Sequence, residues 1–244
     1  MYPMNKIHIS ARGPGWICVE KPSSISVHND PGKDLLSILE SQIDNTMDPN
    51  QAKSMEEKKR LPSVLLQPVH RLDKDTSGLL LLARNPETLA RLSDLFAKGM
   101  VKKRYLALVH GNFDIPSEEI GLWETPLSKE AGGRNNPAGK GKKVRAQTRY
   151  KILRQSLHYA LVEIELLTGR KHQIRRHAKL CGHPVTGDRR YGSQRSVQFL
   201  KETHGYQRLG LHAFRLEFQD LTSRVVITSD QIPVEMENLL NQDL

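Results

Sequence analysis

The pattern of apolar and polar positions divides the chain into short strands and a few amphipathic helices. Apolar runs of strand length predict strands at 15–22, 78–83, 102–111, 145–153, 159–169, 208–219 and 224–229. Apolar residues at helical spacing predict helices at 34–43, 85–99, 170–182 and 234–242. The two kinds of element do not alternate regularly, so a doubly wound sheet is not expected. The pattern predicts an α+β fold with a mixed, largely antiparallel central sheet flanked by helices and loops.

Residues beside these runs indicate where helices begin and end and where the chain leaves regular structure. Asp34 and Asn85 are the predicted N-caps of the first two helices, and Gly99 follows the end of the second. The segment 44–60 has almost no apolar residues, so we expect a mobile insertion there. Glycines and lysines dominate 129–143, which predicts a loop.

Composition and charge restrict the class of protein. The 244 residues are 37% hydrophobic, and 37 Lys and Arg against 27 Asp and Glu give a formal net charge of +10. No apolar run approaches the ~20 residues that cross a bilayer, and the first fifteen residues lack the apolar core of a signal peptide. Two cysteines form one disulfide at most. We therefore expect a single cytoplasmic domain over 1–244, a monomer that does not bind membranes and whose basic surface binds nucleic acid.

The first polar cluster precedes the apolar run at 78–83 and reads "HRLDKDTSG" from His70. An ordinary polar turn would explain its last four residues, because Asp, Thr, Ser and Gly favour turns. It would not explain why His70, Arg71 and Asp73 come just before them. A carboxylate at the end of a strand, with an arginine two residues away, is a candidate for an ionised group that is held in place.

The second cluster, "TGRKHQIRRHAKLCGHPVTGDRRYG", covers 168–192 and has one acid, Asp188. A solvent-exposed basic helix face would be the ordinary explanation. On the predicted helix, Lys171 and Arg175 would share a face, as would His172 and Arg176. So many cations repel one another unless phosphates or buried carboxylates offset them. The cluster's cations are Arg170, Lys171, Arg175, Arg176, Lys179, Arg189 and Arg190.

Other chemistry finds little support in the sequence. His172, His177, Cys181 and His183 are close in sequence, but their spacing matches no standard zinc pattern and cationic neighbours would oppose a dication. The loop at 129–143 lacks the glycine spacing of a phosphate-binding loop. No dinucleotide-binding or serine-hydrolase signature is present. We expect neither a metal nor a small-molecule cofactor.

Four blocks of the sequence together resemble the RluA-type pseudouridine synthases over roughly residues 14 to 230. They are "HRLDKDTSGLLLLA", "KRYLALV", "LLTGRKHQIRRHAKLCGHPVTGDRRYG" and "LGLHAFRLEF". The resemblance implies the pseudouridine synthase fold and isomerisation of a uridine within RNA, without metal, cofactor or energy source. Many relatives carry a small RNA-binding domain in front of the catalytic domain, and we expect this chain to be a stand-alone catalytic domain.

The resemblance also implies roles for individual residues. Asp73 matches the family's essential aspartate, and cleavage of a glycosidic bond needs an anion or nucleophile beside the developing sugar cation. Whether Asp73 attacks the sugar or the base stays open at this point. Arg175 matches the arginine that pairs with this aspartate. Tyr105 matches the tyrosine that stacks on the uracil and can help to move the carbon-5 proton.

Further residues are expected to contact the RNA. Arg71 would occupy the space vacated by a flipped uridine, with His70 beside it, and Leu211 would form an apolar wall for the base. Lys171 stands where many relatives have threonine. The residues expected to contact phosphates are Lys171, Arg176, Arg189 and Arg190.

A different class of function is a non-catalytic RNA-binding protein or RNA chaperone on the same scaffold. The joint presence of Asp73, Tyr105 and Arg175 favours the enzyme, because a binding protein has no use for that trio. Binding to DNA is disfavoured, since the sequence has no helix-turn-helix or zinc-finger pattern. The resemblance leaves two classes of substrate open, transfer RNA and large-subunit ribosomal RNA.

Overall fold

The computed structural model describes residues 6–44, 66–114 and 119–243. The chain divides into two compact units, Met1–Lys98 and Gly99–Leu244. The predicted insertion at 44–60 lies outside the described residues, apart from Asp44. The expectation of a single catalytic domain stays a prediction.

In its described residues, the first unit contains a small antiparallel sheet and the helices α1 and α3. Its strands follow the order β1-β2-β4, and β3 pairs with β4. All seven residues of β4 are buried, which agrees with the purely apolar run that predicted this strand. The elements are β1 (Ile9–Gly13), β2 (Trp16–Lys21), α1 (Leu35–Asp44), β3 (Gln67–Pro68), β4 (Ser77–Ala83) and α3 (Pro86–Ala97).

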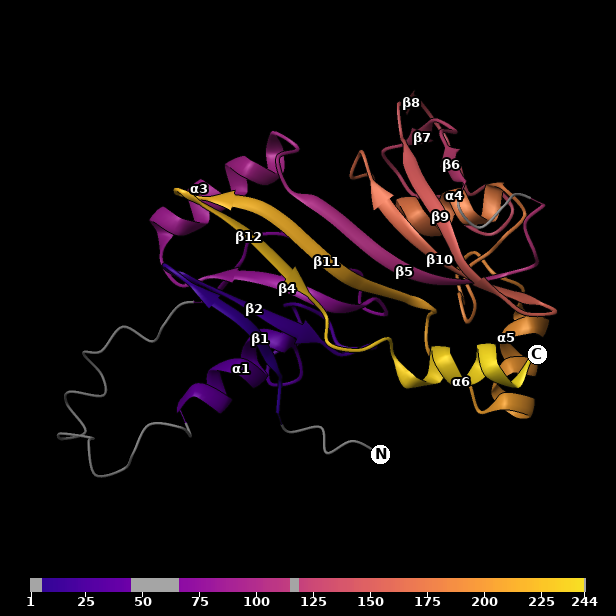
Figure 1. The fold of residues 1–244 in the computed structure, drawn as a ribbon, viewed down its shortest axis with the longest axis horizontal. Helices are drawn as coiled ribbons and strands as arrows, with labels where there is room; N and C mark the ends of the chain where they lie inside the picture. The colour runs from indigo at the N-terminus through magenta and orange to yellow at the C-terminus, as the bar shows by residue number, and fades with distance from the viewer. Residues whose placement is uncertain (1–5, 45–65, 115–118, 244) are drawn as a thin grey trace. The chain divides into compact units, whose positions relative to one another are not determined.

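The second unit contains a larger antiparallel sheet with the strand order β11-β5-β10-β9-β6, and β12 pairs with β11 (Figure 1). A separate two-stranded ribbon joins β7 to β8. The strands are β5 (Lys102–His110), β6 (Ile120–Trp123), β7 (Leu127–Ser128), β8 (Lys143–Val144), β9 (Thr148–Gln155), β10 (Tyr159–Leu166), β11 (Leu211–Asp220) and β12 (Ser223–Thr228). The helices are α4 (Gln173–Leu180), α5 (Gln194–His204) and α6 (Val234–Gln242).

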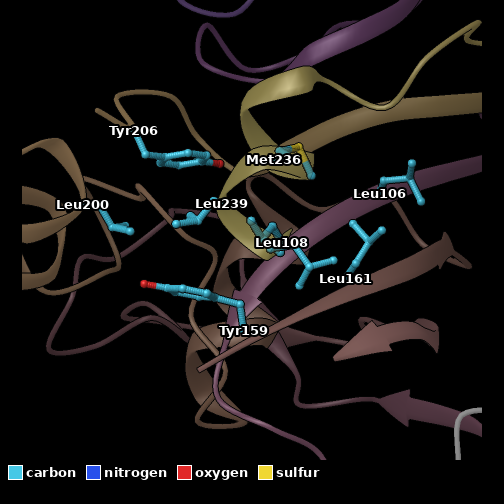
Figure 2. Close-up of a cluster of buried hydrophobic side chains, with 9 residues drawn as sticks. Leu106, Leu108, Tyr159, Leu161, Leu200, Tyr206, Met236 and Leu239 are labelled. Carbon is cyan, nitrogen blue, oxygen red and sulfur yellow. The ribbon is translucent and has the colours of Figure 1, made fainter. Parts of the chain in front are cut away.

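One face of this larger sheet is covered by α5 and α6. Leu106 and Leu108 of β5 point to this face and pack against Leu200 of α5 and Leu239 of α6 (Figure 2). Residues of β5 one position away, such as Tyr105, point to the opposite face, because side chains alternate along a strand. The apolar cluster thus leaves the other face of the sheet to the candidate site.

The α+β architecture with a largely antiparallel sheet is confirmed, and each strand and helix predicted from the pattern is present. The N-caps are also as predicted: the Ser37 N–H donates to Asp34 at 2.9 Å and the Thr88 N–H to Asn85 at 2.8 Å. The ends of the elements differ by a few residues, as expected for boundaries read from a pattern.

The third predicted helix, 170–182, is wrong at its start. It begins only at Gln173, because His172 has a left-handed backbone with φ of 53°. Lys171 and His172 therefore precede the helix, and the faces predicted for them with Arg175 and Arg176 do not exist. Helix α5 was not predicted, although Ser193 and Gly205 stand at its ends as N-cap and left-handed C-cap.

In the described ranges, no helix combines the length and the apolar character needed to span a membrane.

Candidate active site

The predicted catalytic aspartate lies in a tight turn of the first unit that leads into β4. The Thr76 N–H donates to the Asp73 carbonyl at 3.1 Å and closes the turn. The Asp73 side chain is half-buried, whereas Arg71, two residues before it, is exposed. The turn therefore presents a carboxylate and a guanidinium close to each other in the chain, as the first cluster indicated.

His70 attaches the beginning of this turn to the first unit. Its Nε2 accepts a hydrogen bond from the Leu81 N–H at 3.1 Å, and its ring stacks on Phe96 with centroids 4.6 Å apart. These contacts give His70 a structural role. Its contact with RNA stays a prediction.

A buried lysine holds the other end of the turn, and the sequence reasoning missed it. Lys21 is 1% exposed, and its Nζ donates to the Lys74 carbonyl at 2.8 Å and to two more backbone carbonyls. Ser23 Oγ donates to the Asp75 carbonyl at 2.8 Å. A buried ammonium needs such acceptors, so its position and that of the turn determine each other. A lysine inside the apolar run at 15–22 was the available signal.

Two residues expected to contact the base lie on one face of the sheet in the second unit. Tyr105 of β5 is opposite Ala213 of β11, and Leu211 is opposite Ala107. Residues opposite each other point to the same face, as do residues two apart along a strand. Tyr105 and Leu211 are thus diagonal neighbours, within reach of an aromatic ring. Both side chains are buried.

Helix α4 lies on the same face of the sheet. Thr148 of β9 pairs with Leu166 of β10. Two residues before Leu166 in β10, Ile164 pairs with Tyr105 of β5. Thr148 therefore shares the face of Tyr105. His177 of α4 contacts Thr148, with Nδ1 2.9 Å from Oγ1. The structure thus brings the helix of Arg175 to the face of Tyr105 and Leu211.

Arg175 is held by a carboxylate that the sequence reasoning had not assigned to the site. Its Nε and Nη2 donate to the two oxygens of Asp188 at 2.7 and 2.8 Å, and both side chains are almost completely buried. Asp188 Oδ1 also accepts from the N–H groups of Arg190 and Tyr191, each at 2.9 Å. This bidentate pair fixes the plane of the guanidinium. A single acid among seven cations was the signal that Asp188 has a partner.

Tyr191 completes the surroundings of this pair. The guanidinium carbons of Arg175 and Arg190 lie 5.3 and 5.7 Å from the centroid of its ring, a favourable position for cations. Burial raises the pKa of Tyr191, although the two guanidiniums oppose this shift. The neutral phenol lies 2.9 Å from Nδ1 of His172, the residue that starts α4.

Arg176 is enclosed by protein groups, which argues against the phosphate contact expected from its sequence position. Its side chain is completely buried, and its guanidinium donates to the carbonyls of Ser128, Pro137, Ala138 and Lys171. A group so enclosed cannot reach a ligand without unfolding its surroundings. Burial lowers the pKa of this guanidinium.

The other three cations predicted to bind phosphates are accessible. Lys171, Arg189 and Arg190 are exposed, and all three belong to the second unit. Arg190 also donates to the carbonyls of Ala131 and Gly132 at 3.0 to 3.1 Å. Their contacts with RNA stay predictions.

The histidines once considered as zinc ligands have separate protein partners. His177 lies between Thr148 and the Thr125 carbonyl, and burial lowers its pKa. His183 stacks on Phe113 with centroids 3.8 Å apart. Among the residues that the structure describes, no group of three or more His, Cys, Asp or Glu could hold a metal ion.

A family model described as RNA pseudouridylate synthase matches residues 15–180, which is more than half of the chain. An uncharacterized RNA pseudouridine synthase of Zymomonas mobilis is 39% identical over 74% of this chain and 78% of its own length. Ribosomal large subunit pseudouridine synthase C of Vibrio cholerae is 38% identical over 63% of this chain. The same-named protein of Buchnera aphidicola is 35% identical over 83% of it. The chain spans 47% and 59% of the length of these last two relatives.

Two solved human structures have the same fold. RNA pseudouridylate synthase domain containing 4 aligns with a TM-score of 0.71 at 24% identity, covering 96% of this chain and 92% of that one. RNA pseudouridylate synthase domain containing 1 also gives 0.71, at 23% identity, covering 95% and 86%.

Proposed function

The chain belongs to the RluA-type family of RNA pseudouridine synthases, which are isomerases that act on RNA, and we propose that its active site consists of Asp73, Tyr105 and Arg175. The family match covers all three positions. The best support for this trio is the position of Arg175. Its side chain is buried and makes two hydrogen bonds to Asp188, and its helix lies on the same sheet face as Tyr105.

Asp73 supplies the negative charge that the reaction needs. Isomerisation breaks the bond between carbon 1′ of the ribose and N1 of the uracil, and forms a bond from carbon 1′ to carbon 5. The proton on carbon 5 leaves, and N1 ends with a proton. An aspartate can assist by attack or by stabilising the sugar cation, and both routes require it to be ionised and positioned. The bonds from Thr76 and Lys21 to the turn provide that positioning.

Arg175 keeps Asp73 ionised and oriented. Asp188 holds Nε and Nη2 of the guanidinium, and the family resemblance assigns the same guanidinium to Asp73. A nearby guanidinium favours the charged form of a carboxylate and lowers its pKa. Because Asp188 fixes the plane of the fork, this second bond can form without further ordering of the side chain.

Tyr105 and Leu211 form the surface on which the uracil rests. The ring of Tyr105 can stack on the base, and Leu211, its diagonal neighbour, adds an apolar wall. The hydroxyl of Tyr105 is the candidate to move the carbon-5 proton. Arg71, which is exposed, fills the space that the flipped uridine leaves in the RNA.

The substrate that we propose first is a uridine in large-subunit ribosomal RNA, because several relatives bear that RNA in their names. A uridine in transfer RNA is the second candidate. The protein acts as a cytoplasmic monomer and needs no metal or cofactor.

The experiment that tests this proposal is a comparison of Asp73→Asn with wild type. RNA labelled with tritium at uracil carbon 5 is prepared from a strain that lacks the gene, and tritium release is followed in single turnover with excess enzyme. Asparagine keeps the shape but removes the charge, so release should fall below detection while RNA affinity stays within roughly threefold, since little binding energy is expected from an anion near phosphates.

Asp75→Asn is the matched control, because Asp75 lies in the same turn. Its rate should fall by at most about tenfold, or about 1.4 kcal/mol. Normal release by Asp73→Asn would show that another group carries out the reaction. No release by wild type on any RNA would leave the protein as a non-catalytic RNA-binding member of the family.

A further inference from the structure

The segment from Leu127 to Ala146 is lysine-rich, yet it folds as a compact loop of the second unit. Strands β7 and β8 pair at its base, and Leu127, Ala138 and Ala146 form a small buried cluster inside it. We call residues 127–146 the basic loop. Its sequence does not assign it to the active site.

A buried arginine fixes the shape of the basic loop from inside. Arg176 Nε donates to the Pro137 carbonyl at 2.6 Å, Nη2 to the Ala138 carbonyl at 2.6 Å, and Nη1 to the Ser128 carbonyl at 3.1 Å. The bonds join the start and the middle of the loop to α4. The preceding residue of that helix is Arg175, so a single helical turn holds both the proposed catalytic arginine and the loop.

Further arginines hold the outer parts of the loop. Arg190 donates to the carbonyls of Ala131 and Gly132, and Arg170 Nε donates to the Arg145 carbonyl at 3.2 Å. A neutral carbonyl satisfies a guanidinium without cancelling its charge. Each of these bonds orders the loop and leaves the local potential positive.

The charges of the loop itself are almost all of one sign, and most are exposed. Glu130 is its single acid. In the described part of the chain, no ion pair joins any cation of the loop to a carboxylate. These cations are Lys129, Arg134, Lys140, Lys142, Lys143 and Arg145.

We propose that the basic loop is a preformed docking surface for the phosphates of the substrate RNA, with Lys140, Lys142 and Lys143 as its contacts and Arg176 as its positioning residue. The inference rests on the proposed function, because it names a binding surface for the same substrate. Like charges on an ordered loop repel unless a polyanion covers them, and ordering the loop in advance reduces the entropy lost on binding.

The first test removes the charges and leaves the packing unchanged. Lys140→Gln, Lys142→Gln and Lys143→Gln are combined, and the affinity for fluorescently labelled ribosomal RNA from the gene-deleted strain is measured over a range of salt. Three lost phosphate contacts should lower the salt slope by up to about three units and weaken binding at least roughly tenfold at low salt.

The matched control removes three exposed lysines elsewhere, by Lys6→Gln, Lys33→Gln and Lys201→Gln. This variant loses the same three positive charges as the loop variant, so the comparison removes the effect of total charge. Equal losses in the two triple variants would overturn the docking surface, because only the overall charge would then matter. An unchanged slope in the loop variant would overturn it too, as expected if the loop instead contacts an acidic protein.

The second test changes the shape of the loop and none of its charges. Gly139 and Gly141 both have left-handed φ, 79° and 81°. A Cβ on Gly139 would meet Ser128 Oγ at 1.9 Å and the Glu130 carbonyl oxygen at 2.4 Å, whereas one on Gly141 would meet nothing within 4 Å. Gly139→Ala should therefore weaken RNA binding severalfold and make the loop more susceptible to trypsin. Gly141→Ala has the same backbone strain without the clash, so its effects should be clearly smaller. Equal behaviour of the two would contradict a preformed shape.

The role of Arg176 is tested by a double-mutant cycle. Arg176→Met should weaken RNA binding in the wild-type background and have little further effect once the three loop lysines are glutamine. Additive losses would show that Arg176 acts on binding by another route. Thermal unfolding of each variant identifies any that fail to fold, and the lysine variants then decide the question.

These outcomes separate the loop from the isomerase proposal. Below saturating enzyme, the loop variant should release tritium more slowly than wild type, and the difference should shrink as the enzyme concentration rises, since its defect is in binding. If wild type releases none while the loop variant still loses affinity, the isomerase proposal fails and the docking surface stands. If wild type is active and the loop variant binds normally, the docking surface fails alone.

Discussion

Asp188 and Lys21 are buried charged residues whose partners organise the two parts of the proposed site. Charges leave water only when hydrogen bonds and opposite charges replace it. Asp188 meets this condition with Arg175 and two backbone N–H groups, and Lys21 with three carbonyls. Each charge is therefore satisfied by only one arrangement of its neighbours. For Asp188 the neighbour is the proposed catalytic residue Arg175, and for Lys21 it is the carbonyl of Lys74, next to Asp73.

The pair with Asp188 predicts different effects of two substitutions at Arg175. Arg175→Ala leaves Asp188 buried without its cation and should lower the free energy of unfolding by about 3–5 kcal/mol. Arg175→Lys keeps the charge and should lose clearly less stability. Lysine lacks the planar fork, so both variants should lose nearly all tritium release. Urea unfolding and single-turnover assays measure the two effects; near-normal turnover in the lysine variant would mean that charge alone is sufficient.

At the scale of elements, the larger sheet separates packing from chemistry. Even-numbered residues of β5, such as Leu106 and Leu108, pack under α5 and α6 (Figure 2). Tyr105 faces the other way, toward the side on which α4 lies. Strand alternation thus lets one strand serve the core and the site at once.

This division predicts that substitutions in α6 affect stability before they affect turnover. Leu239 is 2% exposed within the apolar cluster, so Leu239→Ala should lower the free energy of unfolding by about 2–5 kcal/mol. Val234, on the same helix, is 52% exposed, and Val234→Ala should change it by less than about 0.5 kcal/mol. Urea unfolding gives both values. The single-turnover rate of folded Leu239→Ala should stay near that of wild type, and a large loss would link the two faces of the sheet.

At the scale of the whole molecule, buried histidines determine how stability depends on mild acid. Burial, assisted by the charge of Arg208, lowers the pKa of His212 from 6.5 to about 3, and burial also lowers the pKa values of His110 and His177. The folded protein keeps these rings neutral, and the unfolded chain protonates them near pH 6.5. Their contribution is therefore fully present above pH 6.5 and is lost as the pH falls below that value.

We expect the free energy of unfolding to decrease from pH 6.5 down to about 4.5, by up to about 1.4 kcal/mol per pH unit for each histidine. Carboxylates with lowered pKa, such as Glu217, add to the loss only below about their ordinary value of 4.5. His212→Gln preserves a donor near Ser229 and should flatten the slope. His28→Gln, at an exposed position, should not. Urea unfolding at several pH values measures the slopes, and equal slopes for the two variants would contradict this assignment.

The sequence alone determined most of the elements and the family. The apolar periods identified the buried strands and most helices, because burial imposes a period of two on strands and of about three and a half on helices. The spacing of the four blocks singled out Asp73, Tyr105 and Arg175 as the proposed catalytic residues, through the resemblance to the family. Helix α5 was missed because most of its residues are polar and few apolar residues mark a buried face.

The tertiary structure decided which charged residues are buried and what they contact. Arg175 and Arg176 are adjacent cations in the sequence, yet one pairs with Asp188 and the other holds the basic loop. Adjacent residues of a helix point about 100° apart, and the packing of α4 decided which of the two arginines meets Asp188. Contacts between residues far apart in the chain, such as Lys21 with Lys74, depend on how the strands pair, which local sequence does not encode.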